Sequence, residues 1–259
     1  LGAPDSHNGW YMNGGQVKLP TIRLPDARTR QWRALIAYRG KLVRRRTAIK
    51  NSIRALLDRQ GLWVAVGRSA WTAAGVQTLG ELARPVDAGW TDDLWRGQLA
   101  LELSALEQTM KMIQQVEQKL DAMGQADSRV QRLQTIPGVG PRLAEIVVAT
   151  IDDPHRFKSR REVAAYAGLV PRQFESGAML RQGRITGAGQ KLLRALLVEV
   201  GWMMKQHNPV LFVIAEKTAR GSKTRKKIGI VALARRLLII CWAMLRDQAD
   251  WQEPKALAA

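Results

Sequence analysis

The chain has 259 residues, a length that suits one large domain or two of ordinary size. Hydrophobic residues make up 46% of the chain, which supports a folded core and excludes wholesale disorder. The 41 lysine and arginine residues outnumber 22 acidic residues, and the formal net charge of +19 predicts a polyanionic partner, usually nucleic acid. A merely soluble basic protein is the alternative. No membrane-surface anchor is expected, because the arginines recur along the whole chain.

Residues 1–24 predict irregular structure, since proline and glycine residues interrupt any periodicity. They contain no cationic segment followed by an apolar one, so no signal peptide is predicted. The single cysteine, Cys241, can form no internal disulfide, and with only three histidines the chain offers no zinc-type cluster. These features favour a reducing, cytoplasmic location.

A long helix is predicted from Asp26, a plausible N-cap, to about Gln60, with Gly61 ending it. Its apolar residues mostly recur at helical spacing, and much of the remaining surface is cationic. A dense cationic helix suits a nucleic-acid backbone, although a solvated helix face is the alternative. The residues expected to bind nucleic acid here are Arg39, Arg44, Arg45, Arg46 and Lys50.

Residues 61–90 predict short helices with turns at Gly75, Gly80 and Pro85, and they suggest no chemistry. A second long helix is predicted from about 92 to 123. Its apolar residues follow one another at intervals of three or four, which is a heptad-like pattern. The pattern fits either an antiparallel pair with the 26–60 helix or pairing with a second copy of the chain. A domain boundary is expected at 124–127.

Residues 133–151 have the form of a helix-hairpin-helix, with two glycines in the turn. Such a turn can approach a phosphate closely, and the following helix presents free backbone N–H groups at its positive end. We therefore expect Gly138, Gly140 and Arg142 to contact the DNA backbone. A tight turn between packed helices is the alternative.

Asp152, Asp153 and His155 follow in a loop that contains a proline. Two adjacent aspartates without a defined third ligand more often form a cap or a turn than a metal site. No metal-binding residue is predicted in this chain.

The next segment, residues 172–186, is expected to be an irregular loop that carries Ser176 among arginines. Arg172, Arg181 and Arg184 could bind a phosphate group bidentately. A serine that attacks phosphorus needs its proton removed and the developing charge neutralised. No Ser-His-Asp grouping lies nearby, so the activator would come from elsewhere, and an ordinary loop serine is the alternative.

A helix is predicted from Gln190 to Met204, and a final helix from about Lys227 to Asp247. The connector between them is either a solvated linker or a second contact with a DNA backbone. Its cations are Lys217, Arg220, Lys223, Arg225, Lys226 and Lys227. The long apolar run within the final helix carries two central arginines, which predicts a buried helix and not a membrane span.

The C-terminal half resembles the transposases of the insertion sequence 110, 116 and 902 type. The resemblance covers roughly Val130 to Arg246, with the motifs in the family's order and spacing. The 26–60 segment looks like the family's basic linker helix. The segments that carry the resemblance are LQTIPGVGPRLAEIVVATI, FKSRREVAAYAGLVPRQFESG, GRITGAGQKLLRALLVEVGW and KKIGIVALARRLLIICWAML.

The resemblance implies an all-α chain. Its expected parts are an irregular remnant at 1–24, a basic helical connector with a coiled-coil-like arm at 25–126, a helical transposase domain at 127–250 and a tail at 251–259. It also implies recombination through a phosphoserine link to DNA, with a guide RNA, in homodimers or homotetramers, in the bacterial cytoplasm at the nucleoid. Ser176 matches the family's serine, in a Ser-Gly element.

Two departures from the family pattern follow. Glu175 and Ala178 stand where the family often has serine and glycine. The family's acidic DEDD set, which binds Mg²⁺, belongs to a domain that would precede residue 20, so this chain is expected to bind no cofactor itself. We therefore expect an N-terminally truncated enzyme, or a non-catalytic DNA- or RNA-binding protein. A dimerisation module built on the 92–123 helix is the third alternative.

Overall fold

The computed structural model describes residues 24–63, 69–88, 91–176 and 179–253. Apart from single-turn 3-10 helices and a β-hairpin, the secondary structure of these residues is α-helical, which confirms the expected all-α class. The helices are α1 (Ala27–Arg59), α2 (Ala73–Leu82), α3 (Leu94–Gln125), α4 (Ser128–Gln134), α5 (Pro141–Ile151), α6 (Arg160–Tyr166), α7 (Lys191–His207), α8 (Pro209–Ala219) and α9 (Lys226–Asp247). The strands are β1 (Pro171–Ser176) and β2 (Met179–Ile185).

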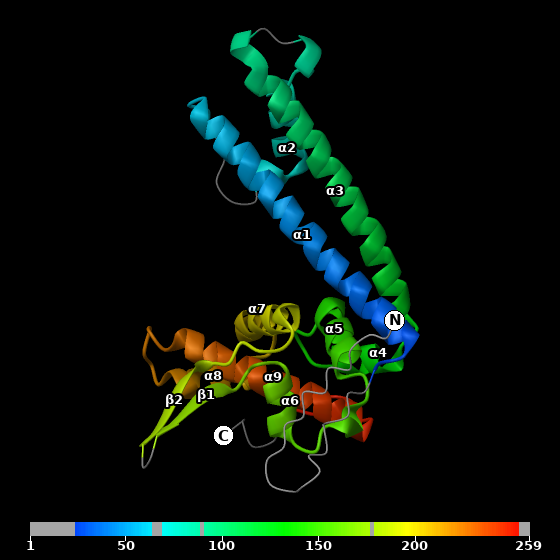
Figure 1. Cartoon of the computed structure of the whole chain (residues 1–259), viewed down its shortest axis with the longest axis vertical. Coiled ribbons are helices and arrows are strands. Elements are labelled where there is room, and N and C mark those ends of the chain that lie inside the picture. The colour runs from blue at the N-terminus through cyan, green and yellow to red at the C-terminus, as the bar shows by residue number, and fades with distance from the viewer. Residues whose placement is uncertain (1–23, 64–68, 89–90, 177–178, 254–259) are drawn as a thin grey trace, which may run out of the picture.

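Helices α1 and α3 run antiparallel and form a long arm that projects from a compact group of shorter helices (Figure 1). The side chain of Asp26 accepts a hydrogen bond from the backbone N–H of Thr29 at 2.6 Å, so the expected N-cap starts α1. Of the two expected pairings of the second long helix, the structure contains the one within the chain. The arm has its own apolar cluster, formed by Ile49, Ile53, Leu56, Leu57, Leu79, Leu99 and Leu106.

The turns expected at Gly75 and Gly80 are wrong, because both glycines lie inside α2. A Cβ atom at Gly75 would lie 2.4 Å from the carbonyl oxygen of Ser69. This glycine therefore lets the short 3-10 helix Ser69–Trp71 fold back against α2. Gly75 is therefore needed for close packing and does not form a turn.

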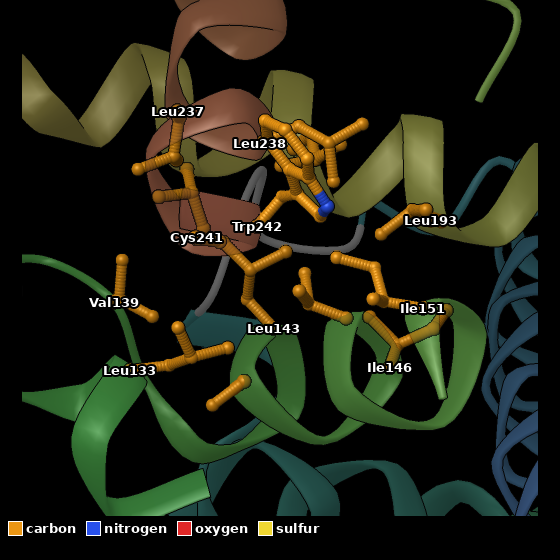
Figure 2. Close-up of a cluster of buried hydrophobic side chains, with 14 of the residues drawn as sticks. Leu133, Val139, Leu143, Ile146, Ile151, Leu193, Leu237, Leu238, Cys241 and Trp242 are labelled. Atoms are coloured by element: carbon orange, nitrogen blue, oxygen red, sulfur yellow. The ribbon is translucent and has the colours of Figure 1, made fainter. Parts of the chain in front are cut away.

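The second apolar cluster forms the core of the compact group, where α4, α5, α7 and α9 meet (Figure 2). Leu143 and Ile146 of α5 point toward Leu238 and Trp242 of α9 in this core. Cys241 lies among them, fully buried, and burial raises the pKa of its thiol to about 12. The thiol therefore packs as a small apolar group.

Helix α9 is the only described helix that is long and apolar enough to cross a membrane, by length and composition alone. In this structure 56% of its apolar window is buried inside the protein. It contacts α4, α5, α6, α7 and α8, so it forms the centre of the C-terminal core, as the two arginines in its apolar run led us to expect.

The arm and the C-terminal core meet at the beginning of α1. Trp32 and Ile36 of α1 are buried in the C-terminal cluster. Arg33 donates hydrogen bonds to the carbonyl oxygens of Ala149 at 2.6 Å and Thr150 at 3.2 Å, in the last turn of α5. These carbonyls lack partners within the helix, so the arginine satisfies them and fixes the arm to the core.

Candidate nucleic-acid interface

The segment that carries Ser176 is a β-hairpin, and the expectation of an irregular loop is wrong. The strands pair antiparallel, from Pro171 opposite Ile185 at the base to Ser176 opposite Met179 at the tip. The side chains of residues 175–182 lie outside the described part, so the structure gives the backbone position of Ser176 and not the direction of its hydroxyl.

The arginines of the hairpin lie on both of its strands, with Arg172 on β1 and Arg181 and Arg184 on β2. Figure 1 labels the two strands. Arg172 and Arg184 are exposed and lie near the base of the hairpin. Arg172 follows Pro171 and Arg184 precedes Ile185, and these two residues are paired across the strands. Arg181 is opposite Phe174, and its side chain is outside the described part. Like charges on neighbouring strands repel, and a bound phosphate would relieve that repulsion. Phosphate binding by these residues stays a prediction.

The glycine turn between α4 and α5 packs against the corner between α7 and α8. Gly138 has φ of +89°, and a Cβ atom there would lie 3.0 Å from the Cβ of His207. The side-chain amide of Asn208 donates to the carbonyl oxygen of Pro137 at 3.4 Å. The positive φ and the close packing against His207 therefore explain why residue 138 is a glycine. Gly140 is the N-cap of α5, and a Cβ atom there would meet nothing within 4 Å, so it leaves the first turn of α5 approachable.

Arg142 is held between two carboxylates, which the sequence did not reveal. Its Nη1 donates to Oε2 of Glu145 at 2.9 Å, and its Nη2 donates to Asp121 on α3. Glu145 is only 1% exposed, and burial raises the pKa of its carboxyl to about 7, although Arg142 acts in the opposite direction. Arg142 thus links α5 to the foot of α3. A lone acid among apolar residues of a helix, LAEIVV, was the signal that could have located Glu145.

Three of the cations expected on the first helix lie in different environments. Arg39 faces α3 and pairs with Glu117, with Nη2 at 2.6 Å from Oε1. Arg44 and Arg45 are exposed and form no ion pair with any described carboxylate. Arg44 and Arg45 are therefore free to bind a polyanion, whereas Arg39 already has a partner across the arm.

The other two expected cations, Arg46 and Lys50, line a cavity of about 650 Å³ between α1, α2 and α3. Trp71 lines the same cavity, and the Nζ of Lys50 lies 4.8 Å from the centroid of one of its rings. Sequence reasoning assigned no role to Trp71. Tryptophan and lysine 21 residues apart in sequence give no periodic signal, so only the folded arm brings them together.

Asp152, Asp153 and His155 form a turn after α5. The hydroxyl of Thr29 donates to Oδ1 of Asp152 at 3.3 Å, and Oδ1 of Asp153 accepts from the backbone N–H of His155 at 2.9 Å. Within the residues that the structure describes, no group of three His, Cys, Asp or Glu side chains could hold a metal ion. Asp153 therefore accepts a hydrogen bond within the turn, whereas Asp152 accepts one from the start of α1.

The segment from the end of α8 to the start of α9 presents a run of cations that form no ion pair with a described carboxylate. α8 ends at Ala219 and is followed by Arg220, its C-cap, which has a left-handed conformation; α9 begins at Lys226. Each of the following cations is exposed: Lys217, Arg220, Lys223, Arg225, Lys226 and Lys227. Several of these charges lie beside the positive end of the α9 dipole, which disfavours them and favours a bound anion.

Comparison with known proteins gives a consistent result. Residues 130–212 match the model of the family described as "Transposase IS116/IS110/IS902 family". The chain is similar to the "Probable family 20 transposase" of Pseudomonas aeruginosa, with 32% identity over 90% of this chain and 69% of the relative. It is 32% identical to the "Transposase for insertion sequence element IS1111A" of Coxiella burnetii, over 85% of this chain and 59% of the relative. A "Pilin gene-inverting protein" of Moraxella bovis is 33% identical over 54% of this chain and 44% of the relative.

Proposed function

This chain belongs to the IS116/IS110/IS902 family of transposases, and from that premise we propose that it acts on DNA in transposition or a related recombination. The observation that carries the proposal is the 32% identity to the Pseudomonas transposase across 90% of this chain. The name of the Moraxella relative, which says that it inverts a gene, supports rearrangement of DNA as the common activity. The chain spans 69% and 59% of the Pseudomonas and Coxiella proteins, so the activity of the whole enzyme is part of the proposal.

We propose Ser176 as the nucleophile. It lies within the matched segment 130–212, and Arg172 and Arg184 on the same hairpin supply cations for a phosphodiester. In the step, a bond forms between the serine oxygen and phosphorus, and the bond between phosphorus and one deoxyribose oxygen breaks. The leaving oxygen takes up a proton, while the serine proton passes to a base. The product is a phosphoserine link that preserves the energy of the broken bond for strand rejoining.

The described residues do not by themselves form a site for the Mg²⁺ that the resemblance implies, because they contain no suitable group of three acidic, histidine or cysteine side chains. The proposal includes DNA as substrate, a guide RNA as partner, and a homodimer or homotetramer as the working assembly.

A covalent-adduct assay tests the nucleophile. The purified chain is incubated with labelled DNA from the two flanks of its own gene, with Mg²⁺ and with or without RNA from that locus. We expect a labelled protein band that survives denaturing electrophoresis and disappears in Ser176→Ala. A Ser176→Ala variant that forms the same adduct would overturn the assignment, and Ser104→Ala, which changes an exposed serine of α3, is the matched control.

A second candidate function is nucleic-acid binding without cleavage. The observation that favours it is the set of exposed cations on α1 and in the α8–α9 connector, which form no ion pair with a described carboxylate. In that case a mobility shift would show binding that weakens steeply with salt, while no adduct forms. Binding that is insensitive to salt would contradict backbone contacts in either function.

A further inference from the structure

The cavity beside Trp71 is set into the side of the arm, away from the hairpin that carries Ser176. Its volume of about 650 Å³ lies within the range of about 300–1,000 Å³ that small-molecule sites have. Leu106, Met110 and Ile113 of α3 provide apolar lining. An apolar hollow of this size suits a flat organic group such as a nucleobase.

Trp71 supplies an aromatic surface at the cavity. The ring lies next to two cations of α1, with Nζ of Lys50 at 4.8 Å and Cζ of Arg54 at 5.4 Å from a ring centroid. The tryptophan is partly exposed and packs at the edge of the arm's apolar cluster. Neighbouring cations and an aromatic ring are the combination with which proteins hold single-stranded nucleic acid.

The charges at the cavity are unequally compensated. Its two acids both have partners, since Glu107 pairs with Lys111 at 2.7 Å and Glu117 pairs with Arg39 at 2.6 Å. Arg46 and Lys50 pair with no carboxylate in the described ranges of the chain. Burial lowers the pKa of Lys50, and the charges of Arg46 and Arg54 lower it further. A phosphate beside Arg46 and Lys50 would compensate two charges that pair with no described carboxylate.

We propose that this cavity binds one unpaired nucleotide of a nucleic-acid strand, with the base against Trp71 and a phosphate beside Arg46 and Lys50. The inference rests on the proposed nucleic-acid binding and specifies the strand state of the partner. A stacked and paired base cannot enter a side cavity, because its faces are covered by its neighbours. The site therefore selects a single strand, a bulge or a loop over a continuous duplex.

Equilibrium binding tests the site with the whole chain. The probes are a fluorescent single strand of about 12 nucleotides, a length within the range of single-strand sites, and the duplex of the same sequence. Trp71→Leu should weaken binding of the single strand about tenfold, the size expected for the loss of one stacked base. Binding of the duplex and the salt dependence should stay unchanged, and Trp71→Phe should restore the single-strand affinity.

A matched pair of lysine variants tests the contact between the cavity and a phosphate. Lys50→Gln should lower the slope of log K against log salt for the single strand by about 0.7, the value for one lost phosphate contact. Lys119→Gln removes the same charge from an exposed position of α3 outside the cavity and should leave the slope unchanged. Photo-crosslinking with a 5-iodouracil-containing strand should modify the peptide that contains Trp71. Circular dichroism of each variant checks that the arm is folded.

The outcomes separate this inference from the function on which it rests. If neither probe binds, the proposed nucleic-acid function fails. If both bind and Trp71→Leu weakens them equally or not at all, the cavity is not a nucleotide site. If Trp71→Leu leaves the binding of both probes unchanged and alters only the mass of the assembly measured by sedimentation, the cavity holds a second copy of the chain. The inference is then overturned.

Discussion

Nη1 of Arg142 donates a hydrogen bond to Oε2 of Glu145 at 2.9 Å, one turn along α5, while its Nη2 reaches Asp121 on α3. This arginine therefore joins the C-terminal core to the foot of the arm. The second carboxylate oxygen of Glu145, Oε1, is buried and accepts no hydrogen bond from the described residues. A carboxylate with so little solvation depends on its single cationic partner.

Replacing Arg142 should destabilise the protein more than replacing a similar arginine of the arm. Arg142→Met leaves Glu145 buried without its cation, and we expect a loss of about 3 kcal/mol in the free energy of unfolding. Arg39→Met, which breaks the more exposed pair with Glu117, should cost about 1 kcal/mol or less. Urea denaturation at pH 8 measures both. Equal losses would show that burial of Glu145 contributes nothing.

Glu145 should make stability depend on pH. Its pKa in the folded protein is raised from 4.5 to about 7, so the folded state holds the proton more tightly than the unfolded state. The stabilisation is complete below pH 4.5 and is lost as the pH rises through 7, by about 3 kcal/mol in all. Glu145→Gln should therefore reduce the difference in Tm between pH 5 and pH 8. Glu199→Gln, an exposed carboxylate on α7, should leave that difference as it is in the wild type.

The two glycines of the α4–α5 turn should respond differently to alanine. Gly138→Ala forces a side chain into a positive φ and against His207, so we expect a loss of stability of about 1–2 kcal/mol. Gly140 has φ of −84° and open space, and Gly140→Ala should change stability by about 0.5 kcal/mol or less. Thermal unfolding measures these effects. If Gly140→Ala leaves the fold intact but weakens DNA binding, the turn contacts the backbone; unchanged binding would contradict that prediction.

The cationic connector between α8 and α9 should contribute to binding of duplex DNA. We expect the triple variant Lys223→Gln, Arg225→Gln, Lys227→Gln to lower the salt slope by about 3, since each lost phosphate contact removes about 0.9. Arg39→Gln is a useful comparison, because its cation is already paired with Glu117. A triple variant with the wild-type slope would identify the connector as a solvated linker.

Sequence periodicity was sufficient to find the long helices. Apolar residues at intervals of three and four predicted a helix over 92–123, and the structure has α3 at Leu94–Gln125. The prediction of a helix from Asp26 to about Gln60 corresponds to α1 at Ala27–Arg59, because the capping aspartate and the glycine at 61 mark its ends. The motifs around residues 133–197 likewise identified the family, which the similarity to known transposases confirms.

Local pattern could not decide which charges are free and which are paired. Arg142 and Arg39 read as surface cations, yet each meets an acid that is 21 or 78 residues away in the chain. The same limit applies to the partner of α3, because a heptad-like stripe specifies an apolar face but not the helix that covers it. The sequence by itself determined the long helices, the family and the excess of positive charge. Only the tertiary structure decided which cations remain available to a polyanion, because ion pairing depends on distances between segments that the fold alone brings together.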